Sequence, residues 1–487
     1  MRTTLHHALR TGLASLVLLG IATQATGQVT PLGSPFHVSP GNGPITTHAL
    51  APSSLENPEG AIAVWRFGNS DFQAQRIDFI PGLGPNLGPF TSIASTSPGP
   101  LWLRPTPDGA LALMPAAALR LDSEAQPVGE LFPLDTPQYV RNLPGGGLLG
   151  IGQTEFWGPY FARHFTLEGT VGDRIDLDVL PTRTITQGLL VHDDRTYSVI
   201  YGGPHRIQRF VDHQPDGPPR EVSGGVTDYH AEAVDVGDGG ALWLWREKVD
   251  EVHTLNVRRI EADGSLSPTV YQPLPPGLLV SVGAPEMAAD SRGNVWLVWA
   301  AHVSLPGTPG WAYGRVLGPD GRPLSEIFQV HANAGGYQQF PRVVIDAEDR
   351  ALITWRHHVP GGSRLMGRFY APFGEDDTVT HLRAGRFRVE LTWEDHRGDL
   401  GEGHRVPNNS DTSALLWFFE PDNWEMLIKV IDGCSFNGHH WVFVAATTDV
   451  AYTLTVTDTL LGTERVYANP LGVASPAITD TVALPCN

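Results

Sequence analysis

The chain has 487 residues and a formal net charge of −19, from 33 basic and 52 acidic residues. A chain this acidic repels phosphate backbones, so we expect no nucleic acid partner. Hydrophobic residues make up 41% of the chain, which is enough for ordinary buried cores. With 54 glycines and 41 prolines, about a fifth of the residues favour turns, which suits many short strands.

The N-terminal segment has the layout of a secretory signal peptide. Arg2 and Arg10 precede the apolar run Leu13–Ile21, and small residues follow up to Gly27. The run is too short to span a bilayer, and no other stretch approaches that length. We therefore predict that residues 1–27 are a signal peptide and that the protein is secreted, periplasmic or displayed on the cell surface. Cleavage removes two arginines and no acid, which changes the net charge from −19 to −21.

A unit of three or four short strands recurs along most of the chain. Its second strand is an apolar run after a turn, and its third strand contains an arginine 11 to 22 residues later. The second strands are expected at Gly60–Trp65, Gly109–Met114, Gly146–Ile151, Arg195–Ile200, Gly240–Trp245, Gly293–Trp299 and Arg350–Trp355. The third-strand arginines are Arg76, Arg120, Arg163, Arg209, Arg259, Arg315 and Arg368, which we expect to pair with acids in neighbouring strands.

The unit lengths of about 37 to 57 residues are typical of β-propeller blades. The last unit has no fourth strand, whereas Ser34–Val38 near the N-terminus looks like the fourth strand Ile327–Val330. We therefore predict an all-β protein in which residues 28–376 form a seven-bladed β-propeller closed by the N-terminal strand. Because the unit at 140–180 is poorly formed, the predicted number of blades is seven, plus or minus one. An open stack of sheets is the alternative, and it would leave that strand unpaired.

Two copies show the motif of the repeat most clearly: Gln75-Arg-Ile-Asp78 and Pro319-Asp-Gly-Arg-Pro-Leu324. Over roughly residues 30–375 the repeat resembles a blade-like motif common in exported bacterial proteins. That resemblance implies a propeller and no particular chemistry.

The C-terminal part, residues 381–487, has longer strands with alternating apolar and polar residues, as in Phe387–Trp393. About seven such strands and no helix-period run predict an antiparallel β-sandwich. Cys434 and Cys486 are the only cysteines, and an even number in an exported chain predicts one disulfide. Two reduced thiols or a metal pair are the alternatives.

Several stretches of this part stand out: Phe387–Trp393, Trp417–Phe419, Glu425–Cys434, Asn437–His439, Trp441–Phe443 and Ala474–Thr481. Over these stretches the domain closely resembles an uncharacterised C-terminal β-domain found on many exported bacterial proteins. The resemblance implies an accessory module and assigns no catalytic residue.

The candidate ligand-binding residues lie at the ends of second strands and in the loops that follow. Arg66, Arg246 and Arg356 each follow a tryptophan, and on one rim they would bind a carboxylate or a sulfated sugar. Separate surface ion pairs are the alternative. The long loops hold Trp157, Trp311 and Tyr313, whose rings would stack on sugars or else pack between blades.

Other chemistry is poorly supported by the sequence. A sialidase-like propeller would carry Asp boxes between third and fourth strands, but Asp290–Trp296 falls between first and second strands and no full box occurs. Asn408, Asn409 and Asp411 form an oxygen-rich loop that would suit Ca²⁺, with a plain solvated turn as the alternative. We identify no other metal ligand set and no catalytic residue.

Taken together, the sequence predicts an exported, non-catalytic binding or surface-interaction protein with the propeller rim as its ligand platform. Its partner would be a glycan or an extracellular protein. The alternative is a glycoside hydrolase or polysaccharide-cleaving enzyme with its site at the propeller mouth. A structural part of an extracellular assembly is a third hypothesis.

Overall fold

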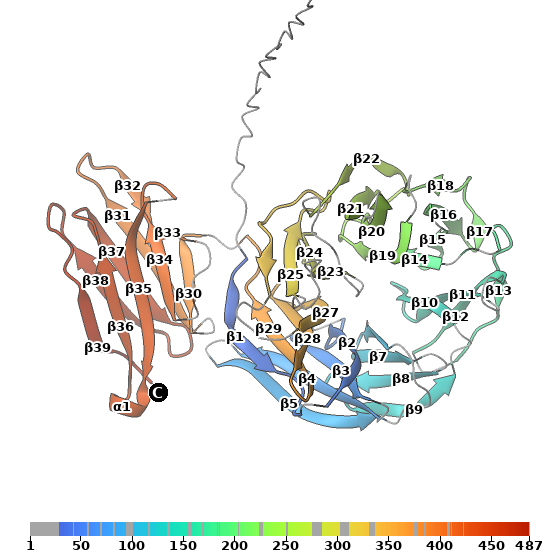
Figure 1. Ribbon diagram of the computed structural model, residues 1–487, viewed down its shortest axis with the longest axis horizontal. Helices are drawn as coiled ribbons and strands as arrows, with labels where there is room; N and C mark the ends of the chain where they lie inside the picture. Colours follow the sequence, from blue (N-terminus) through green and yellow to red (C-terminus); the bar gives the residue numbers. More distant parts are fainter. Residues whose placement is uncertain are drawn as a thin grey trace, which may run out of the picture.

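The protein is built almost entirely of β-strands in the computed structural model (Figure 1). Its only helix among the described residues is the four-residue α1 (Cys434–Asn437). The structure describes residues 29–486 except 42, 56–57, 69–70, 81–82, 94–100, 115–116, 134–136, 154–157, 168–169, 183, 185, 203, 224–226, 250–251, 275–284, 302–310, 331–336, 375–376, 384–385, 407–409, 411 and 422. The predicted signal peptide therefore lies outside the described residues. No helix within them is long and apolar enough to cross a membrane.

Seven consecutive antiparallel sheets make up the described residues before Ala371, and we number them 1 to 7 in chain order. Sheets 1 to 3 consist of β2 (Ile45–Pro52), β3 (Gly60–Phe67), β4 (Phe72–Ile80) and β5 (Gly84–Ile93); β6 (Trp102–Thr106), β7 (Gly109–Met114), β8 (Ala117–Asp122) and β9 (Pro127–Pro133); and β10 (Pro137–Asn142), β11 (Leu148–Gln153), β12 (Tyr160–Phe165) and β13 (Ile175–Asp176).

Sheets 4 to 7 continue the same order, with the first strand of each at one edge. They consist of β14 (Thr186–Val191), β15 (Thr196–Tyr201), β16 (Arg206–Val211) and β17 (Gln214–Pro215), with β18 (Arg220–Glu221) also on β16; β19 (Thr227–Asp235), β20 (Ala241–Val249), β21 (Val252–Ile260) and β22 (Leu266–Tyr271); β23 (Glu286–Ala289), β24 (Val295–Ala301), β25 (Trp311–Leu317) and β26 (Phe328–Gln329); and β27 (Tyr337–Ile345), β28 (Ala351–Val359), β29 (Gly362–Tyr370) and β1 (Pro31–His37).

The N-terminal strand completes the last sheet, as predicted. β1 pairs antiparallel with β29, and Pro31 lies opposite Tyr370. The first strand of every sheet contacts the first strand of the next, and β27 of sheet 7 contacts β2 of sheet 1. These first strands are therefore the innermost ones, and the sheets follow one another around a common centre (Figure 1).

The hydrophobic core of this region is divided among the junctions between sheets. The second strand of each sheet is buried on both faces, which explains its continuous apolar sequence. In β24, for example, Trp296 and Val298 pack toward sheet 7 while Leu297 and Trp299 pack toward sheet 5. One such cluster joins sheet 7 to sheet 1 and includes Leu32, the second residue of β1. Each sheet is thus held by its two neighbours.

The third-strand arginines all lie on the third strands of their sheets, and several bind the adjacent sheet. Arg76 forms ion pairs with Asp78 at 2.6 Å and with Glu124 of sheet 2 at 2.7 Å. Pairing with acids is confirmed for Arg76, Arg120, Arg209 and Arg259, but these acids lie in the turns or just beyond the strand ends and not in neighbouring strands as predicted. Arg315 and Arg368 instead donate to backbone carbonyls, including Pro273 O of sheet 5 and Val330 O of sheet 6. Arg76, Arg259, Arg315 and Arg368 thus link neighbouring sheets.

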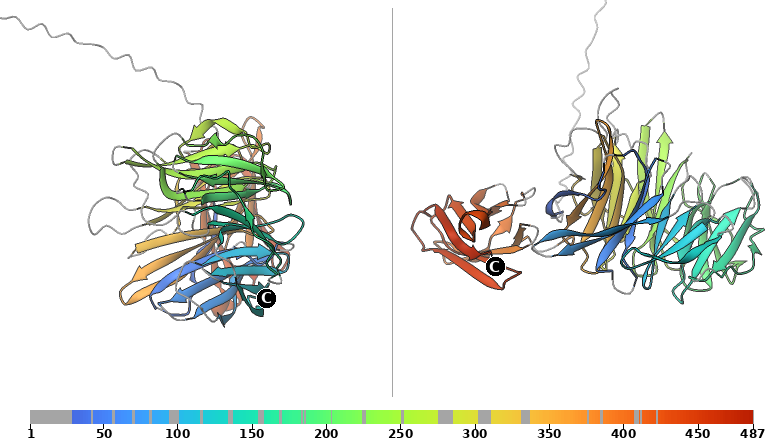
Figure 2. Two further views of the ribbon diagram at one scale, coloured as in Figure 1. Left: turned by 90° about the vertical axis from the view of Figure 1, so that its right-hand side faces the viewer. Right: turned by 90° about the horizontal axis from the view of Figure 1, so that it is seen from below.

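The two remaining sheets lie to one side of the seven (Figures 1 and 2). One contains β30 (Val379–Leu382), β31 (Phe387–Glu394), β37 (Ala451–Asp458) and β38 (Thr463–Asn469), with β32 (Leu400–Glu402) on β31. The other contains β33 (His404–Arg405), β34 (Ser413–Trp417), β35 (Trp424–Gly433), β36 (His439–Ala446) and β39 (Ile478–Pro485). The first of these strands begins at Val379, two residues before the predicted boundary at 381.

These two C-terminal sheets share one contiguous core, to which β30, β31, β34 to β37 and β39 all contribute. The predicted disulfide is confirmed: Cys434 and Cys486 are bonded, 52 residues apart in the sequence. It ties the end of β39 to the turn after β35. In the chain-entropy model a loop of this size contributes about 4 kcal/mol to stability.

Candidate functional site

Charged side chains gather on the innermost strands of five of the seven sheets. They are Arg104 on β6, Arg141 on β10, Glu232 on β19, Glu286 on β23 and Arg342 on β27, and we call them the central charge cluster. The charges of Glu232 and Glu286 act on Arg104, although these residues belong to sheets 5, 6 and 2. Electrostatic interaction between such distant sheets places the cluster at the common centre. Sequence analysis did not predict it.

The cluster is connected by hydrogen bonds that cross from sheet to sheet. Arg342 forms an ion pair with Glu286, and their side chains are 26% and 20% exposed. The Met287 amide of β23 donates to Glu232 at 3.1 Å. Arg104 Nε donates to the Val140 carbonyl of β10 at 3.0 Å, and Arg141 Nη1 donates to the same carbonyl at 3.1 Å. The two arginines are thus anchored by the backbone.

Burial dominates the protonation of this cluster. It raises the pKa of Glu232 to about 8, and the neighbouring Glu286 adds to the increase against the opposing charges of three arginines. Burial and the adjacent Arg141 lower the pKa of Arg104 to about 9. Although burial also acts on Arg342, its ion pair with Glu286 raises its pKa. At neutral pH Glu232 is therefore mostly protonated, while the three arginines keep their charge.

A buried histidine borders the cluster. His48 lies on β2, is 3% exposed, and its Nε2 has no hydrogen-bond partner among the described atoms. Burial, followed by the charges of Arg342 and Arg356, lowers its pKa well below the usual range. His48 is therefore neutral and adds no charge to the centre. Tyr139 on β10 also adjoins the cluster, and burial raises its pKa.

A cavity of 290 Å³ opens at the end of the innermost strands where they turn into the second strands. We call it the mouth cavity. Its lining draws on five consecutive sheets through Leu55, Thr106, Asn142, Val191 and Asp235. Thr106 and Arg104 lie on the same face of β6, about 7 Å apart along the strand. The cavity lining thus includes Thr106 and Asn142, which lie two residues after Arg104 and one residue after Arg141, and no member of the cluster itself.

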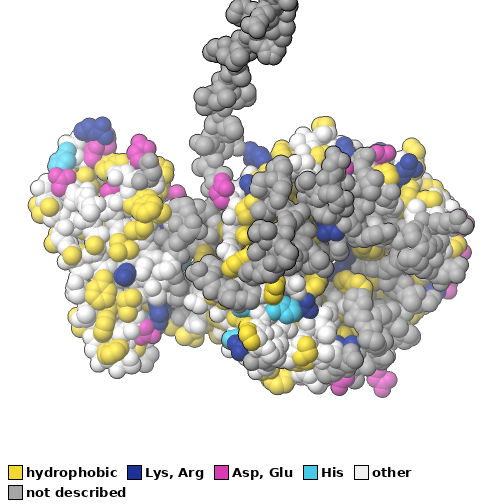
Figure 3. Space-filling view, viewed as in Figure 1, with side chains coloured by type: hydrophobic (Ala, Val, Ile, Leu, Met, Phe, Trp, Pro, Cys, Tyr) yellow, Lys and Arg dark blue, Asp and Glu magenta, His cyan; other side chains and the backbone are white. Residues whose placement is uncertain are grey.

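The three arginines predicted for the rim occupy equivalent positions near the opposite ends of their second strands. Arg66 is buried and lies over the Phe72 ring at 5.1 Å, and Arg246 is also buried. Arg356 is half-buried: it donates to Ile45 O at 2.8 Å and to Gln339 at 2.7 Å, and it lies over the Phe340 ring at 4.3 Å. Figure 3 shows Lys or Arg and His side chains side by side near the middle of this view.

The predicted aromatic residues are placed differently from one another. Trp157 lies outside the described residues. Trp311 is half-buried at the start of β25. Tyr313 packs against the core between sheets 5 and 6, and its ring stacks on Trp299 with the centroids 6.1 Å apart. Tyr313 thus has the inter-sheet packing role that the sequence left open. The predicted Ca²⁺ loop at 408–411 contains Asn408, Asn409 and Asp411, which also lie outside the described residues.

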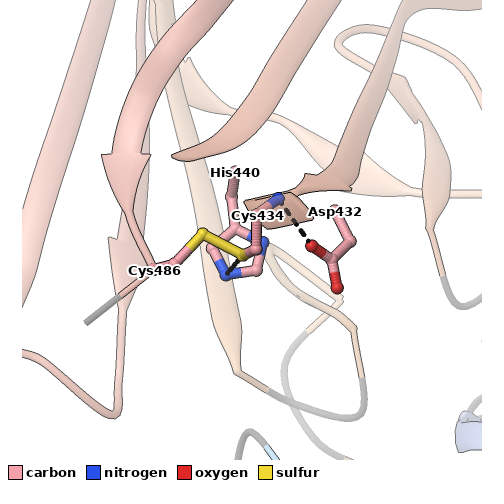
Figure 4. Close-up of side chains that lie close together, drawn as sticks. All are labelled: Asp432, Cys434, His440 and Cys486. Carbon is pink, nitrogen blue, oxygen red and sulfur yellow. Dashed lines mark hydrogen bonds between the residues drawn. A yellow bond between two sulfur atoms is a disulfide. The ribbon is translucent and has the colours of Figure 1, made fainter. Parts of the chain in front are cut away.

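A second polar group surrounds the disulfide (Figure 4). Potential ligand atoms of Asp432, Cys434, His440 and Cys486 lie within 4.8 Å of one another. The two sulfurs are bonded to each other, however, so neither can act as a thiolate ligand. Burial and then Arg386 lower the pKa of His440, and its Nε2 lies 3.6 Å from Cys434 Sγ. This group packs around the disulfide of the C-terminal sheets.

Comparison with known proteins gives distant structural similarities alone. No protein-family model matches the chain, and no curated protein is similar to it. A protein of unknown function from Dyadobacter fermentans is 10% identical over 71% of this chain and 99% of its own, with a TM-score of 0.39.

Two further solved structures are similarly distant. A protein of unknown function from Bacteroides caccae is 15% identical over 49% of this chain and 78% of its own, with a TM-score of 0.32. A triple arginine-to-alanine mutant of AofleA from Arthrobotrys oligospora is 9% identical over 72% and 88%, with a TM-score of 0.37. At these scores the similarities carry no argument about function.

Proposed function

We propose that the first seven sheets form a seven-bladed β-propeller closed by β1, and that the two C-terminal sheets form a β-sandwich. The proposal is supported by the contacts of the innermost strands, which run from each sheet to the next and from sheet 7 back to sheet 1. The hydrophobic clusters follow the same circular order. In a propeller the innermost strands line a central channel, where ligands commonly bind.

We propose further that the protein is an exported binding protein whose ligand enters the mouth cavity and reaches the central charge cluster. The observation that carries this proposal is the excess of arginine over ionised carboxylate at the centre of an otherwise acidic chain. At neutral pH three arginines face the charge of Glu286, because Glu232 is mostly protonated. Export is supported by the predicted signal peptide and by the disulfide.

The ligand that fits this centre carries an anionic group. Arg104 and Arg141 are held by backbone carbonyls, and within the described residues neither forms an ion pair. A guanidinium fork anchored in this way keeps its remaining donors for a carboxylate or sulfate, which it binds with charge-assisted hydrogen bonds. A saccharide bearing such a group would suit a cavity of 290 Å³. We therefore propose an acidic or sulfated saccharide as ligand.

The test is a glycan array probed with the exported form, residues 28–487, that includes neutral, acidic and sulfated polysaccharides. We expect binding to be confined to the acidic and sulfated members. Binding to neutral glycans alone, or no binding at all, would contradict the proposal.

One observation favours the enzyme alternative. A carboxyl group with a pKa of about 8, as burial and Glu286 produce at Glu232, is suited to act as a general acid in glycoside cleavage. Glu286, which forms an ion pair with Arg342, would then be the second carboxylate. Incubating each array hit with the protein and measuring new reducing ends distinguishes the two functions. Cleavage that Glu232→Gln abolishes would establish the enzyme, whereas binding without turnover supports the binding protein.

A further inference from the structure

Two histidines from neighbouring sheets face each other away from the central charge cluster. His164 lies on β12 of sheet 3, and His213 lies in the turn between β16 and β17 of sheet 4. Their Nε2 atoms are 3.1 Å apart, and the two rings are nearly perpendicular, at 87°. Neither the fold of the sheets nor the proposed ligand site uses this pair.

The turn that carries His213 holds two residues other than glycine at positive φ. Asp212 and His213 form a two-residue hairpin loop, with φ angles of 48° and 63°. Both lie in the left-handed region, which costs roughly 1 kcal/mol or more for each residue that is not glycine. Such turns favour Asn-Gly. His213 thus occupies the position that glycine usually takes.

A second contact fixes the orientation of the His213 ring. Tyr197 OH lies 3.0 Å from His213 Nδ1, and the tyrosine ring is itself stacked on Phe210 at 5.1 Å. An oxygen that accepts from Nδ1–H leaves Nε2 with a free lone pair, which is the usual support for a metal-binding histidine. The contact of Tyr197 with the other ring nitrogen thus fixes the position of the Nε2 atom of His213.

The spacing and surroundings of the pair suit a metal ion. Two metal–nitrogen bonds of about 2.0–2.1 Å that end on atoms 3.1 Å apart meet at an angle of about 100°, close to the tetrahedral value. His164 also lines a cavity of 510 Å³, which leaves room for water on the remaining positions.

We propose that His164 and His213 form a binding site for a divalent transition metal ion, with Zn²⁺ as the principal candidate. The two Nε2 atoms supply two ligands, Tyr197 orients one of them, and water or a small ligand in the adjoining cavity completes the coordination. Imidazole and water are ligands that suit Zn²⁺, Cu²⁺ and Ni²⁺. The site joins sheet 3 to sheet 4, so a bound ion would also fasten these two sheets together.

Calorimetric titration of the untagged full-length chain with Zn²⁺ tests the proposal. We expect one site per chain, absent in His164→Gln and in His213→Asn. The second variant keeps a residue that tolerates a positive φ, so the turn should still form. Tyr197→Phe should weaken binding roughly tenfold, as loss of a supporting hydrogen bond does. His396→Gln is the control, because that exposed histidine lies beside Asp449 at 3.3 Å and contacts no other histidine among the described residues.

Circular dichroism of each variant without metal verifies that it folds. Folded variants that bind Zn²⁺ as the unaltered protein does would overturn the proposal, and so would an unaltered chain that binds no Zn²⁺. Either result would leave the pair as a hydrogen bond between two neutral imidazoles. A site lost in His396→Gln but retained in His164→Gln and His213→Asn would show binding elsewhere and would equally reject the assignment.

Discussion

The C-terminal sheets and the seven preceding sheets handle buried charge in opposite ways. In the C-terminal sheets Arg386 is paired with Asp458, which is fully buried, through bonds of 2.7 to 3.1 Å. Two backbone amides, of Leu460 and Leu461, also donate to the same carboxylate. At the centre of the seven sheets, by contrast, three arginines meet two glutamates, one of which is mostly protonated at neutral pH.

This difference indicates different roles. A charge pair that is neutralised in place, beside one contiguous core and a disulfide, holds a structure together. Charges that are concentrated, largely buried and incompletely neutralised are expensive to keep, and they are characteristic of ligand sites. The comparison therefore indicates a stabilising role for the buried pair of the C-terminal sheets, and it accords with the recognition role that we propose for the centre of the seven sheets.

The largest expected effect is on the C-terminal ion pair. Arg386→Met leaves the Asp458 carboxylate buried without its partner, which should cost about 3–5 kcal/mol. Hydrogen exchange in β37 measures the free energy of opening. Arg465→Met, which removes an exposed partner of Asp480, is the control and should cost less than about 1 kcal/mol. Equal effects of the two variants would contradict a structural role specific to the buried pair.

The next largest effect concerns the junction between sheet 7 and sheet 1. Leu32 is 7% exposed in the cluster that joins them, so Leu32→Ala should cost about 2–4 kcal/mol. The loss should appear as faster hydrogen exchange in β29, with which β1 pairs. Leu83→Ala, at a side chain that is 67% exposed, is the matched control and should leave exchange unchanged. An unchanged β29 in Leu32→Ala would favour an open stack of sheets.

An effect of a different kind, which depends on pH, is expected at Glu232. Its pKa rises from an ordinary 4.5 to about 8 in the folded chain, so between these values the folded state binds more protons than the unfolded state. The unaltered protein should therefore lose stability as pH rises from about 4.5 to about 8, by up to roughly 1.4 kcal/mol per pH unit. Glu232→Gln should remove this dependence.

Urea unfolding of the two proteins at several pH values checks this expectation. Their difference in unfolding free energy should grow in favour of Glu232→Gln across that window and stay constant outside it. Glu130→Gln, at an exposed position on β9, is the control. A difference that does not vary with pH would show that Glu232 titrates as an ordinary glutamate.

The smallest effect is expected at the arginines first predicted for the rim. If these arginines formed the binding site predicted from the sequence, Arg246→Ala would weaken binding of an acidic glycan. Arg66 and Arg246 are buried, and Arg356 is already engaged with Ile45 O and Gln339. We therefore expect each alanine variant to change affinity for an array hit by less than about fivefold, or about 1 kcal/mol. A larger loss in all three would favour the rim as the binding site.

The sequence was sufficient to predict the repeating strands, because a second strand buried on both faces must be continuously apolar. It also located the seven third-strand arginines and the strand that pairs with β29. The central charge cluster was missed because its members stand alone in weakly patterned strands, such as Pro137–Asn142 around Arg141. Their convergence depends on how seven sheets pack. The signal in the sequence that could have indicated the cluster was a single charged residue midway along each of several first strands.

The His164–His213 pair was missed for the same reason. The two residues are 49 positions apart and belong to different units, and no ligand spacing in the sequence links them. The burial of Arg66 and Arg246 could not be read from the sequence either, since an arginine after a tryptophan can end a strand at the surface or inside it.

The most direct test of the account is calorimetric titration of an acidic saccharide from the array into three proteins. These are the unaltered chain, the double variant Arg104→Gln with Arg141→Gln, and the triple alanine variant at Arg66, Arg246 and Arg356. Each lost charge-assisted hydrogen bond should cost about 1.5–3 kcal/mol, so the double variant should bind more than tenfold more weakly while the triple variant changes little. A double variant with unchanged affinity would contradict the assignment of recognition to the central charge cluster.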